Sequence, residues 1–363
     1  MKLFHSTPAG SRRTARRARS GPIAITALAA AIGLAGCAGT TAAPVSGQPS
    51  GDSAPLTLTV AQAASQINNA PVYLAQTLGY YEEEGLDITI LDATGANTTT
   101  LVASGQADLG DLGPGGALLM TKQGRPTTII YQQLDAGAGA YVFAKPDVQS
   151  IDEVRGQRFG TFSVGSGTYG VANVLSTRQG LDFDLVPLQN SSAISAAIVS
   201  DQVAAGNGNY SDFANDVESG KLHLLIDAND AAQREKYVGD PYPAGVTFGL
   251  VDTVDKKSDA IVAFLHARNR ALEWMQESTP EQVATELRKS AAYATIDEKA
   301  LIVAIERGLE FVSPDQGRIS DSTWEYALTQ YAVWGLDGFD ASDPMYGYEE
   351  RVDMSLLDEA LAE

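Results

Sequence analysis

The sequence predicts an α/β protein whose sheets are mostly parallel. Between residues 56 and 251, short runs rich in β-branched residues alternate with helical runs, which is the pattern of repeated βαβ units. After residue 251 the predicted strands stop, and long amphipathic helices follow, for example over 260–274 and 301–309. The 308 residues from 56 to 363 are enough to bury a substantial core in one or two domains.

The expected elements follow one another regularly. Strands are expected at 56–60, 86–91, 127–131, 141–143, 158–164, 183–188, 222–226 and 246–251. Helices are expected over 71–78, 98–104, 168–178 and 193–200. A weak internal repeat aligns residues 101–115 with the chain 96 positions further on, with identical Ser, Gln and Gly residues. The repeat predicts a short strand in each copy and makes the polar turns 111–113 and 207–209 equivalent. Both turns would lie at carboxyl ends of strands, where open α/β sheets bind ligands.

The first 37 residues have the features of a bacterial lipoprotein signal peptide. Six basic residues and no acidic residue precede an apolar stretch at 23–34, which is too short to cross a bilayer as a mature helix. Leu34-Ala-Gly-Cys37 resembles a lipobox, and Cys37 is the only cysteine of the chain. We predict that residues 1–37 direct export and that lipidated Cys37 anchors the protein to the outer face of the cytoplasmic membrane. A chance cysteine within a signal peptide is the alternative.

Residues 38–55 are small, polar and rich in Pro and Gly, so we predict a disordered tether.

The composition of the chain excludes several classes of function. The net charge of −20 argues against a nucleic-acid partner. With one cysteine and three histidines, no disulfide, metal site or cofactor is expected. We also find no P-loop and no nucleophile elbow, so catalysis is not expected.

The loop Gly165-Ser-Gly-Thr-Tyr-Gly170 fits G-x-G-x-x-G between a predicted strand and a predicted helix. A dinucleotide site would need an acidic residue at the end of the next strand, whereas Asp182 and Asp184 lie at its start. The same loop suits a small ligand, because N–H groups at a helix N-terminus favour a negative or partially negative atom. A dinucleotide-dependent oxidoreductase that uses Gly165–Gly170 stays open as an alternative.

Several motifs, in the order in which they occur, resemble the periplasmic solute-binding proteins of ABC importers. They are APVYLAQTLGYYEEEGLDITI at 70–90, SGQADL at 104–109, IDEVRGQRFG at 151–160, the loop 165–170 and GLD at 180–182. The resemblance is to the group that takes nitrate, sulfonates, taurine and thiamine-precursor pyrimidines. It implies two α/β lobes, with a hinge of two crossings near 138–145 and 240–248 and extra C-terminal helices. Lobe 1 would comprise 56–140 plus 247–363, and lobe 2 would comprise 141–246.

This resemblance also implies a function. It implies a monomeric lipoprotein that captures a small organic solute in the cleft between its lobes and delivers it to an ABC permease and its ATPase. Yeast pyrimidine synthases share this fold, but they rely on a cysteine cluster and a histidine that have no counterpart here. A lipid-anchored sensor module with the same fold remains an alternative.

We expect the turns that follow strands to supply the ligand contacts. The candidates are Gln66, Asn69, Asp111, Gly113 and Pro114 in lobe 1, Asp135 in the first crossing, and Ser163, Ser166, Gly167, Thr168, Asn207, Asn209 and Tyr210 in lobe 2. Each could instead be a helix cap, a turn former or a core side chain. None is basic, and Asp111 and Asp135 would accept hydrogen bonds from amino groups. An aminopyrimidine resembling a thiamine precursor is therefore favoured over sulfonate, taurine or nitrate.

Overall fold

The computed structural model describes residues 55–64, 66–188 and 190–362, and residues Ser53–Glu363 form one compact unit. The predicted signal peptide, Cys37 and the predicted tether up to residue 54 lie outside the described residues. No helix in these ranges has the length and hydropathy that a membrane span requires.

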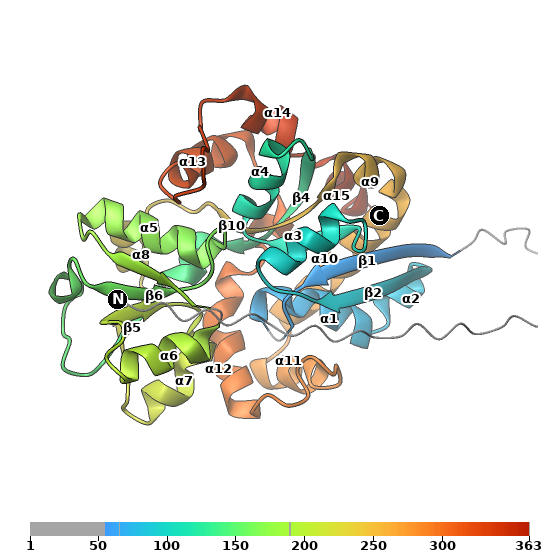
Figure 1. The fold of residues 1–363 in the computed structure, drawn as a ribbon. Coiled ribbons are helices and arrows are strands. Elements are labelled where there is room, and N and C mark those ends of the chain that lie inside the picture. The colour runs from blue at the N-terminus through green and yellow to red at the C-terminus, as the bar shows by residue number, and fades with distance from the viewer. Residues whose placement is uncertain (1–54, 65, 189, 363) are drawn as a thin grey trace, which may run out of the picture. The chain divides into compact units, whose positions relative to one another are not determined.

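The first sheet has five strands in the order β2-β1-β3-β10-β4 (Figure 1). The strands are β1 (Leu56–Gln62), β2 (Leu86–Asp92), β3 (Leu109–Leu112), β4 (Thr127–Asp135) and β10 (Pro243–Leu250). Strand β1 pairs in parallel with β2 and β3, whereas β10 is antiparallel to both of its neighbours. The mostly parallel arrangement predicted from the sequence is therefore confirmed for this sheet.

The second sheet repeats the first one, in the order β7-β6-β8-β5-β9. The strands are β5 (Val142–Ala144), β6 (Arg158–Thr161), β7 (Asp184–Pro187), β8 (Ala205–Asn207) and β9 (His223–Ile226). The fourth strand, β5, is again antiparallel to its neighbours. The chain passes between the sheets twice, from β4 to β5 and from β9 to β10. In each sheet the antiparallel strand is the one that the chain enters after such a passage.

Helices follow the strands, and further helices follow β10. They are α1 (Ala70–Thr77), α2 (Tyr80–Glu83), α3 (Ala96–Ala103), α4 (Pro114–Lys122), α5 (Gly167–Gln179), α6 (Ser191–Val199), α7 (Tyr210–Glu218), α8 (Ala231–Tyr237), α9 (Val251–Lys256), α10 (Ser258–Glu277), α11 (Pro280–Leu287), α12 (Glu298–Gly308), α13 (Asp321–Tyr331), α14 (Tyr348–Arg351) and α15 (Ser355–Ala360). The expected strand at 158–164 ends at Thr161, because the chain turns there into α5. The two short strands of the predicted repeat are β3 and β8, each of which follows a helix.

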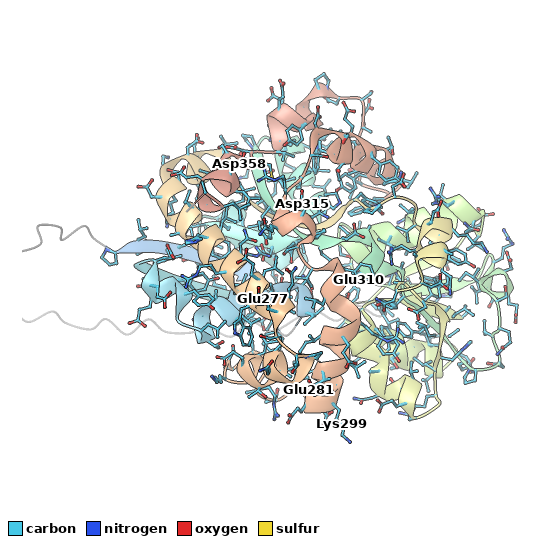
Figure 2. All side chains as sticks on the ribbon, turned by 180° about the vertical axis from the view of Figure 1, so that it is seen from behind. Glu277, Glu281, Lys299, Glu310, Asp315 and Asp358 are labelled. Atoms are coloured by element: carbon cyan, nitrogen blue, oxygen red, sulfur yellow. The ribbon has the colours of Figure 1, made fainter. Side chains whose placement is uncertain are left out.

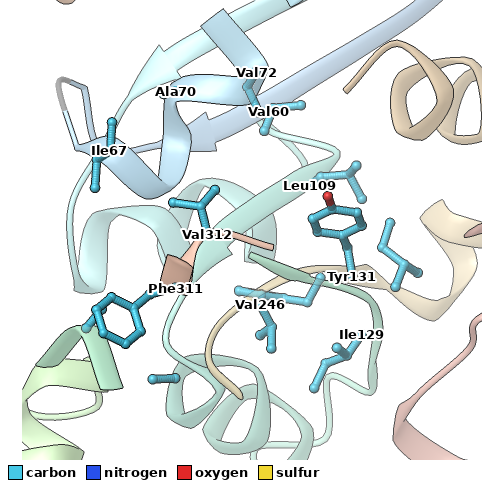
Figure 3. Packing of buried hydrophobic residues seen from close by; sticks show 14 of the residues in the cluster. Val60, Ile67, Ala70, Val72, Leu109, Ile129, Tyr131, Val246, Phe311 and Val312 are labelled. Atoms are coloured by element: carbon cyan, nitrogen blue, oxygen red, sulfur yellow. The ribbon is translucent and has the colours of Figure 1, made fainter. Parts of the chain in front are cut away.

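The core of the first sheet contains apolar residues from neighbouring strands and from α1. Figure 3 shows the buried side chains of Val60, Leu109, Tyr131 and Val246 on strands of this sheet, with Val72 of α1 beside Val60. All five are buried. Removing such side chains from water is the main favourable contribution to folding, about 25 cal/mol per Å² of apolar surface. The turns at the strand ends are thus carried by a rigid sheet.

The helix α12 and the residues that follow it contact elements of both sheets. Val312 forms an isolated bridge with Leu134 of β4, whereas Arg307 Nη1 lies 3.2 Å from Asp227 Oδ1, which follows β9. Figure 2 shows this segment from behind, with Lys299 at one end and Glu310 at the other. The lobe boundaries stay a prediction; the second boundary, between 246 and 247, lies inside β10.

Candidate functional site

A cavity of about 640 Å³ lies where the strand ends of the two sheets meet. Turns after β1, β2 and β3 line it from the first sheet, and turns after β6, β7 and β8 line it from the second. Residues of β4 and β10 complete the lining, among them Gln133 and Ala244. The cavity therefore occupies the position where open α/β sheets bind their ligands.

Nine of the thirteen residues proposed from the sequence line this cavity. They are Gln66, Asn69, Asp111, Gly113, Ser163, Ser166, Gly167, Thr168 and Asn209. Most of them lie in the turns singled out by the repeat and by the glycine-rich loop. The structure therefore brings together residues that are up to 143 positions apart in the sequence, from Gln66 to Asn209.

The other four proposed residues lie outside the cavity lining. Pro114 is the first residue of α4. An N–H at that position would have no acceptor within the helix, so proline costs no helix hydrogen bond there. Asp135 caps the short helix 136–140 by accepting a hydrogen bond from the N–H of Gly137 at 2.8 Å. The Arg307 guanidinium lies over the ring of Tyr210, with its central carbon 3.9 Å from the ring centroid. Each of these three residues thus has a structural role of its own, and its contact with a ligand stays a prediction.

Asn207 is the fourth residue outside the cavity lining, although it ends the central strand β8. Its amide Nδ2 donates to the carbonyl oxygens of Gly139 at 2.9 Å and Thr168 at 3.0 Å. The side chain has no exposed surface. It therefore ties the β8 turn to the first passage between the sheets and to the start of α5.

Other lining residues were not identified from the sequence. Asn68 and Gln133 are joined by a 2.6 Å hydrogen bond from Asn68 Nδ2 to Gln133 Oε1. Gln133 lies within β4, two residues before the end of the strand, so no turn signal marks it. Asp92 is the last residue of β2, and Asn190 lies three positions after the end of β7. The same rule of turns after strands would have found these two residues, had it been applied to every strand.

Six α-helices begin at the cavity. Their N-cap residues, all of which line it, are Asn69, Gly95, Gly113, Ser166, Asn190 and Asn209. The first N–H groups of a helix have no partner within the helix, and the helix dipole places a partial positive charge there. The cavity wall therefore favours ligand atoms that carry partial negative charge.

Asp111 lines the cavity, but its carboxylate points into the core. Its Oδ1 accepts a hydrogen bond from the Thr247 hydroxyl, and its Oδ2 lies 3.5 Å from Nη1 of Arg268. Neither the Asp111 nor the Arg268 side chain has exposed surface. Burial raises the pKa of Asp111, while Arg268 and the Thr247 hydroxyl act to lower that pKa. The amino-binding role expected for this carboxylate would compete with Arg268.

The turns after β3 and β6 touch through their backbones. A Cβ atom at Gly113 would lie 2.5 Å from the amide nitrogen of Gly167, and one at Gly167 would lie 2.1 Å from the carbonyl oxygen of Ala244. Real Cβ atoms do not approach other atoms so closely, so only glycine fits at both places. The glycine pattern at 165–170 thus has a packing explanation that requires no dinucleotide.

The comparisons with known proteins cover most of the chain. A family model described as NMT1/THI5 like matches residues 66–282. The putative binding protein YtlA of Bacillus subtilis is 25% identical over 287 residues, which are 74% of this chain and 81% of YtlA. The 4-amino-5-hydroxymethyl-2-methylpyrimidine phosphate synthase THI11 of Saccharomyces cerevisiae is 28% identical over 144 residues, only 38% of this chain and 41% of the synthase.

Solved structures share the fold. The periplasmic nitrate-binding protein NrtA of Synechocystis PCC 6803 has a TM-score of 0.65 at 15% identity and covers 85% of this chain and 88% of its own. The ligand-binding component of an ABC-type import system from Staphylococcus aureus, solved with zinc bound, has a TM-score of 0.63 at 13% identity, covering 84% and 98%. These likenesses confirm the predicted fold of periplasmic binding proteins. Among the residues described here, no group of three or more His, Cys, Asp or Glu side chains could hold a metal ion.

Proposed function

Because the chain belongs to the NMT1/THI5-like family, we propose that it is an extracytoplasmic solute-binding protein of an ABC-type importer. It captures a small solute in the cavity between the two sheets and delivers it to a membrane permease. The observation that carries this proposal is the lining of the cavity, to which turns of both sheets contribute. Relatives that are binding proteins match most of the chain, whereas the synthases match a minor part, so we propose no catalysis.

Binding would act by closure. The turns after β3 and β6 meet at Gly113 and Gly167, and both glycines line the cavity. A solute that contacts both sheets has more contacts in the closed form, so it shifts the population toward that form. The closed form is then the one that the permease selects.

The lining supports an uncharged polar solute. Seven amide side chains line the cavity: Gln66, Asn68, Asn69, Asn97, Gln133, Asn190 and Asn209. Amides donate and accept hydrogen bonds, which suits a heterocycle or an amide-bearing compound. An aminopyrimidine resembling a thiamine precursor belongs to this class and remains the favoured candidate, through the amides rather than through Asp111 and Asp135. Sulfonates, taurine and nitrate come next.

The location outside the cytoplasm and the membrane anchor are parts of the proposal. The anchor would be Cys37, which lies outside the described residues, and the protein would act as a monomer. Metabolic labelling with a fatty acid tests the anchor. Label in the wild-type protein that is lost in Cys37→Ala supports it, and equal labelling of both proteins rejects it.

A thermal-shift screen of the compact unit Ser53–Glu363 tests the solute-binding function. The panel contains an aminopyrimidine, taurine, an alkanesulfonate, nitrate and NAD. A solute present at 100 times its Kd stabilises the folded state by about 2.7 kcal/mol, which raises the Tm by several degrees. Ala64→Trp, which places a large side chain at a partly exposed position of the lining, is the control. A shift with one small solute that the control lacks is expected; a shift with NAD alone would contradict the proposal.

A further inference from the structure

The cavity has no positively charged side chain in its wall, although a guanidinium lies directly behind it. No lining residue, all of which belong to the described part of the chain, is Lys, Arg or His. The turn Asp111–Gly113 forms part of the wall, and the Arg268 guanidinium of α10 lies on the core side of this turn. Arg268 Nη1 also donates to the Thr247 hydroxyl at 2.8 Å. The guanidinium lies over the ring of Tyr131, 4.1 Å from its centroid.

The Asp111–Arg268 pair is an unusual choice for a core. Oδ2 of Asp111 and Nε and Nη2 of Arg268 are buried and have no hydrogen-bond partner. An ion pair that is buried with unsatisfied atoms contributes little to stability, because desolvation offsets the Coulomb attraction. An apolar pair would serve packing at least as well. Asp111 lines the cavity and Arg268 lies directly behind Asp111, and this position of the ion pair points instead to an effect on the ligand.

We propose that Asp111 sets the charge selectivity of the cavity: its carboxylate cancels the positive charge of Arg268, so that the site takes uncharged polar solutes and rejects anions. This inference rests on the proposed function, because it names the class of solute for the same cavity. Arginine remains protonated in proteins, so only a neighbouring carboxylate can cancel its charge. Asp111 therefore acts on the solute through Arg268, whose charge it neutralises, and is not a direct ligand of the solute.

The helix N-termini at the cavity do not oppose this assignment. They carry partial charges, which suit carbonyl, ring-nitrogen or amide-oxygen atoms of a neutral solute. A small anion in a protein site usually has a charge-assisted partner such as Arg or Lys. Without Asp111, Arg268 would supply this charge from a layer of low dielectric, where Coulomb interactions are stronger than in water.

Anion binding to the compact unit Ser53–Glu363 tests the inference. Nitrate and methanesulfonate are titrated by thermal shift, with chloride as the reference at equal ionic strength. The wild-type protein is expected to show no saturable response to either anion. Asp111→Asn uncovers the charge of Arg268 and is expected to bind both anions at least tenfold more tightly than the wild type does. The double variant Asp111→Asn/Arg268→Gln, in which both charges are removed, is expected to lose this gain.

Asp92→Asn is the matched control. Asp92 is the other carboxylate of the lining, it is exposed, and Asp92→Asn changes the net charge by the same amount without uncovering a buried guanidinium. An equal gain of anion binding in Asp92→Asn and Asp111→Asn would overturn the inference, as would a gain that survives in the double variant. If Asp111→Asn does not fold, the wild type still decides, because saturable stabilisation by millimolar nitrate or methanesulfonate would overturn the inference. A wild type that binds a neutral solute while Asp111→Asn gains no anion would reject the charge assignment and leave the solute-binding function standing.

Discussion

The turns at Asp111 and Asn207 occupy the same place in the two sheets but differ in chemistry. Each follows the central strand of its sheet, β3 or β8, and each side chain is buried beside the antiparallel strand. Asp111 pairs with Thr247 of β10 and with Arg268 of α10, whereas Asn207 binds two carbonyl oxygens and no charged group. The same fold position thus fastens a turn either through a charge pair or through a neutral amide. The first arrangement also brings a charge to the cavity wall.

Breaking the Asp111–Arg268 pair should have the largest effect on the free energy of unfolding. Arg268→Met leaves the Asp111 carboxylate buried without a cation, which should cost about 3–5 kcal/mol of unfolding free energy. Urea denaturation of the wild type and the variant measures this loss. Adding Asp111→Asn to Arg268→Met removes the stranded charge and should recover most of the stability. If the double variant is no more stable than Arg268→Met, the loss of stability in Arg268→Met does not come from the unpaired charge of Asp111.

Asp135 sharpens the comparison, because it is a buried carboxyl group that is capped by an N–H rather than held in an ion pair. Burial raises its pKa to about 6, against the hydrogen bond from Gly137 and the more distant charge of Arg234. The folded protein therefore binds this proton more tightly than the unfolded chain does, and wild-type stability falls as the pH rises from about 4 to about 6.

Asp135→Asn should remove that loss. A shift of about two pKa units corresponds to about 3 kcal/mol, so the variant should be more stable than the wild type by roughly that amount at pH 7.5 and equally stable near pH 4. The side-chain oxygen of Asn can still accept the hydrogen bond from Gly137. Denaturation curves across this pH range provide the measurement. A stability difference that does not change with pH would contradict the assignment.

The neutral turn should be less sensitive than the charged one. Asn207→Ala removes two hydrogen bonds and leaves the carbonyl oxygens of Gly139 and Thr168 without these donors. The expected loss is about 1–3 kcal/mol, smaller than that of Arg268→Met. The same denaturation assay tests the order, with Asn173→Ala as a control: Asn173 is partly buried and donates to backbone oxygens of Tyr169 and Trp334. An Asn207→Ala loss that exceeds the Arg268→Met loss would reverse the comparison.

The sequence allowed the architecture and most of the cavity to be predicted, because both depend on local patterns. The alternation of strands and helices located eight of the ten strands of the two sheets. The repeat located the other two, β3 and β8, and paired the Asp111 and Asn207 turns correctly. The rule of turns after strands found residues such as Ser166 and Asn209. Position relative to a strand is encoded locally, so residues selected by that rule fall near the cavity.

Other features could not be predicted, because they depend on contacts between distant segments. Arg268 reaches Asp111 from α10, which follows the last strand of the first sheet, and no spacing in the sequence signals that contact. Gln133 lies inside a long strand, and only the packing of β10 beside it brings it to the cavity. Whether a turn side chain faces the cavity or the core, as with Asn207, depends on the partner it finds there.

Native mass spectrometry tests the central claim most directly. The compact unit Ser53–Glu363 is mixed with a protein-free extract of small polar metabolites, freed of excess solute by gel filtration, and weighed beside the Ala64→Trp variant. The account predicts one uncharged small solute retained per wild-type chain and none retained by the variant. A wild type that keeps no solute from such an extract, or a variant that keeps the same solute equally well, would contradict the assignment of this cavity as a solute-binding site.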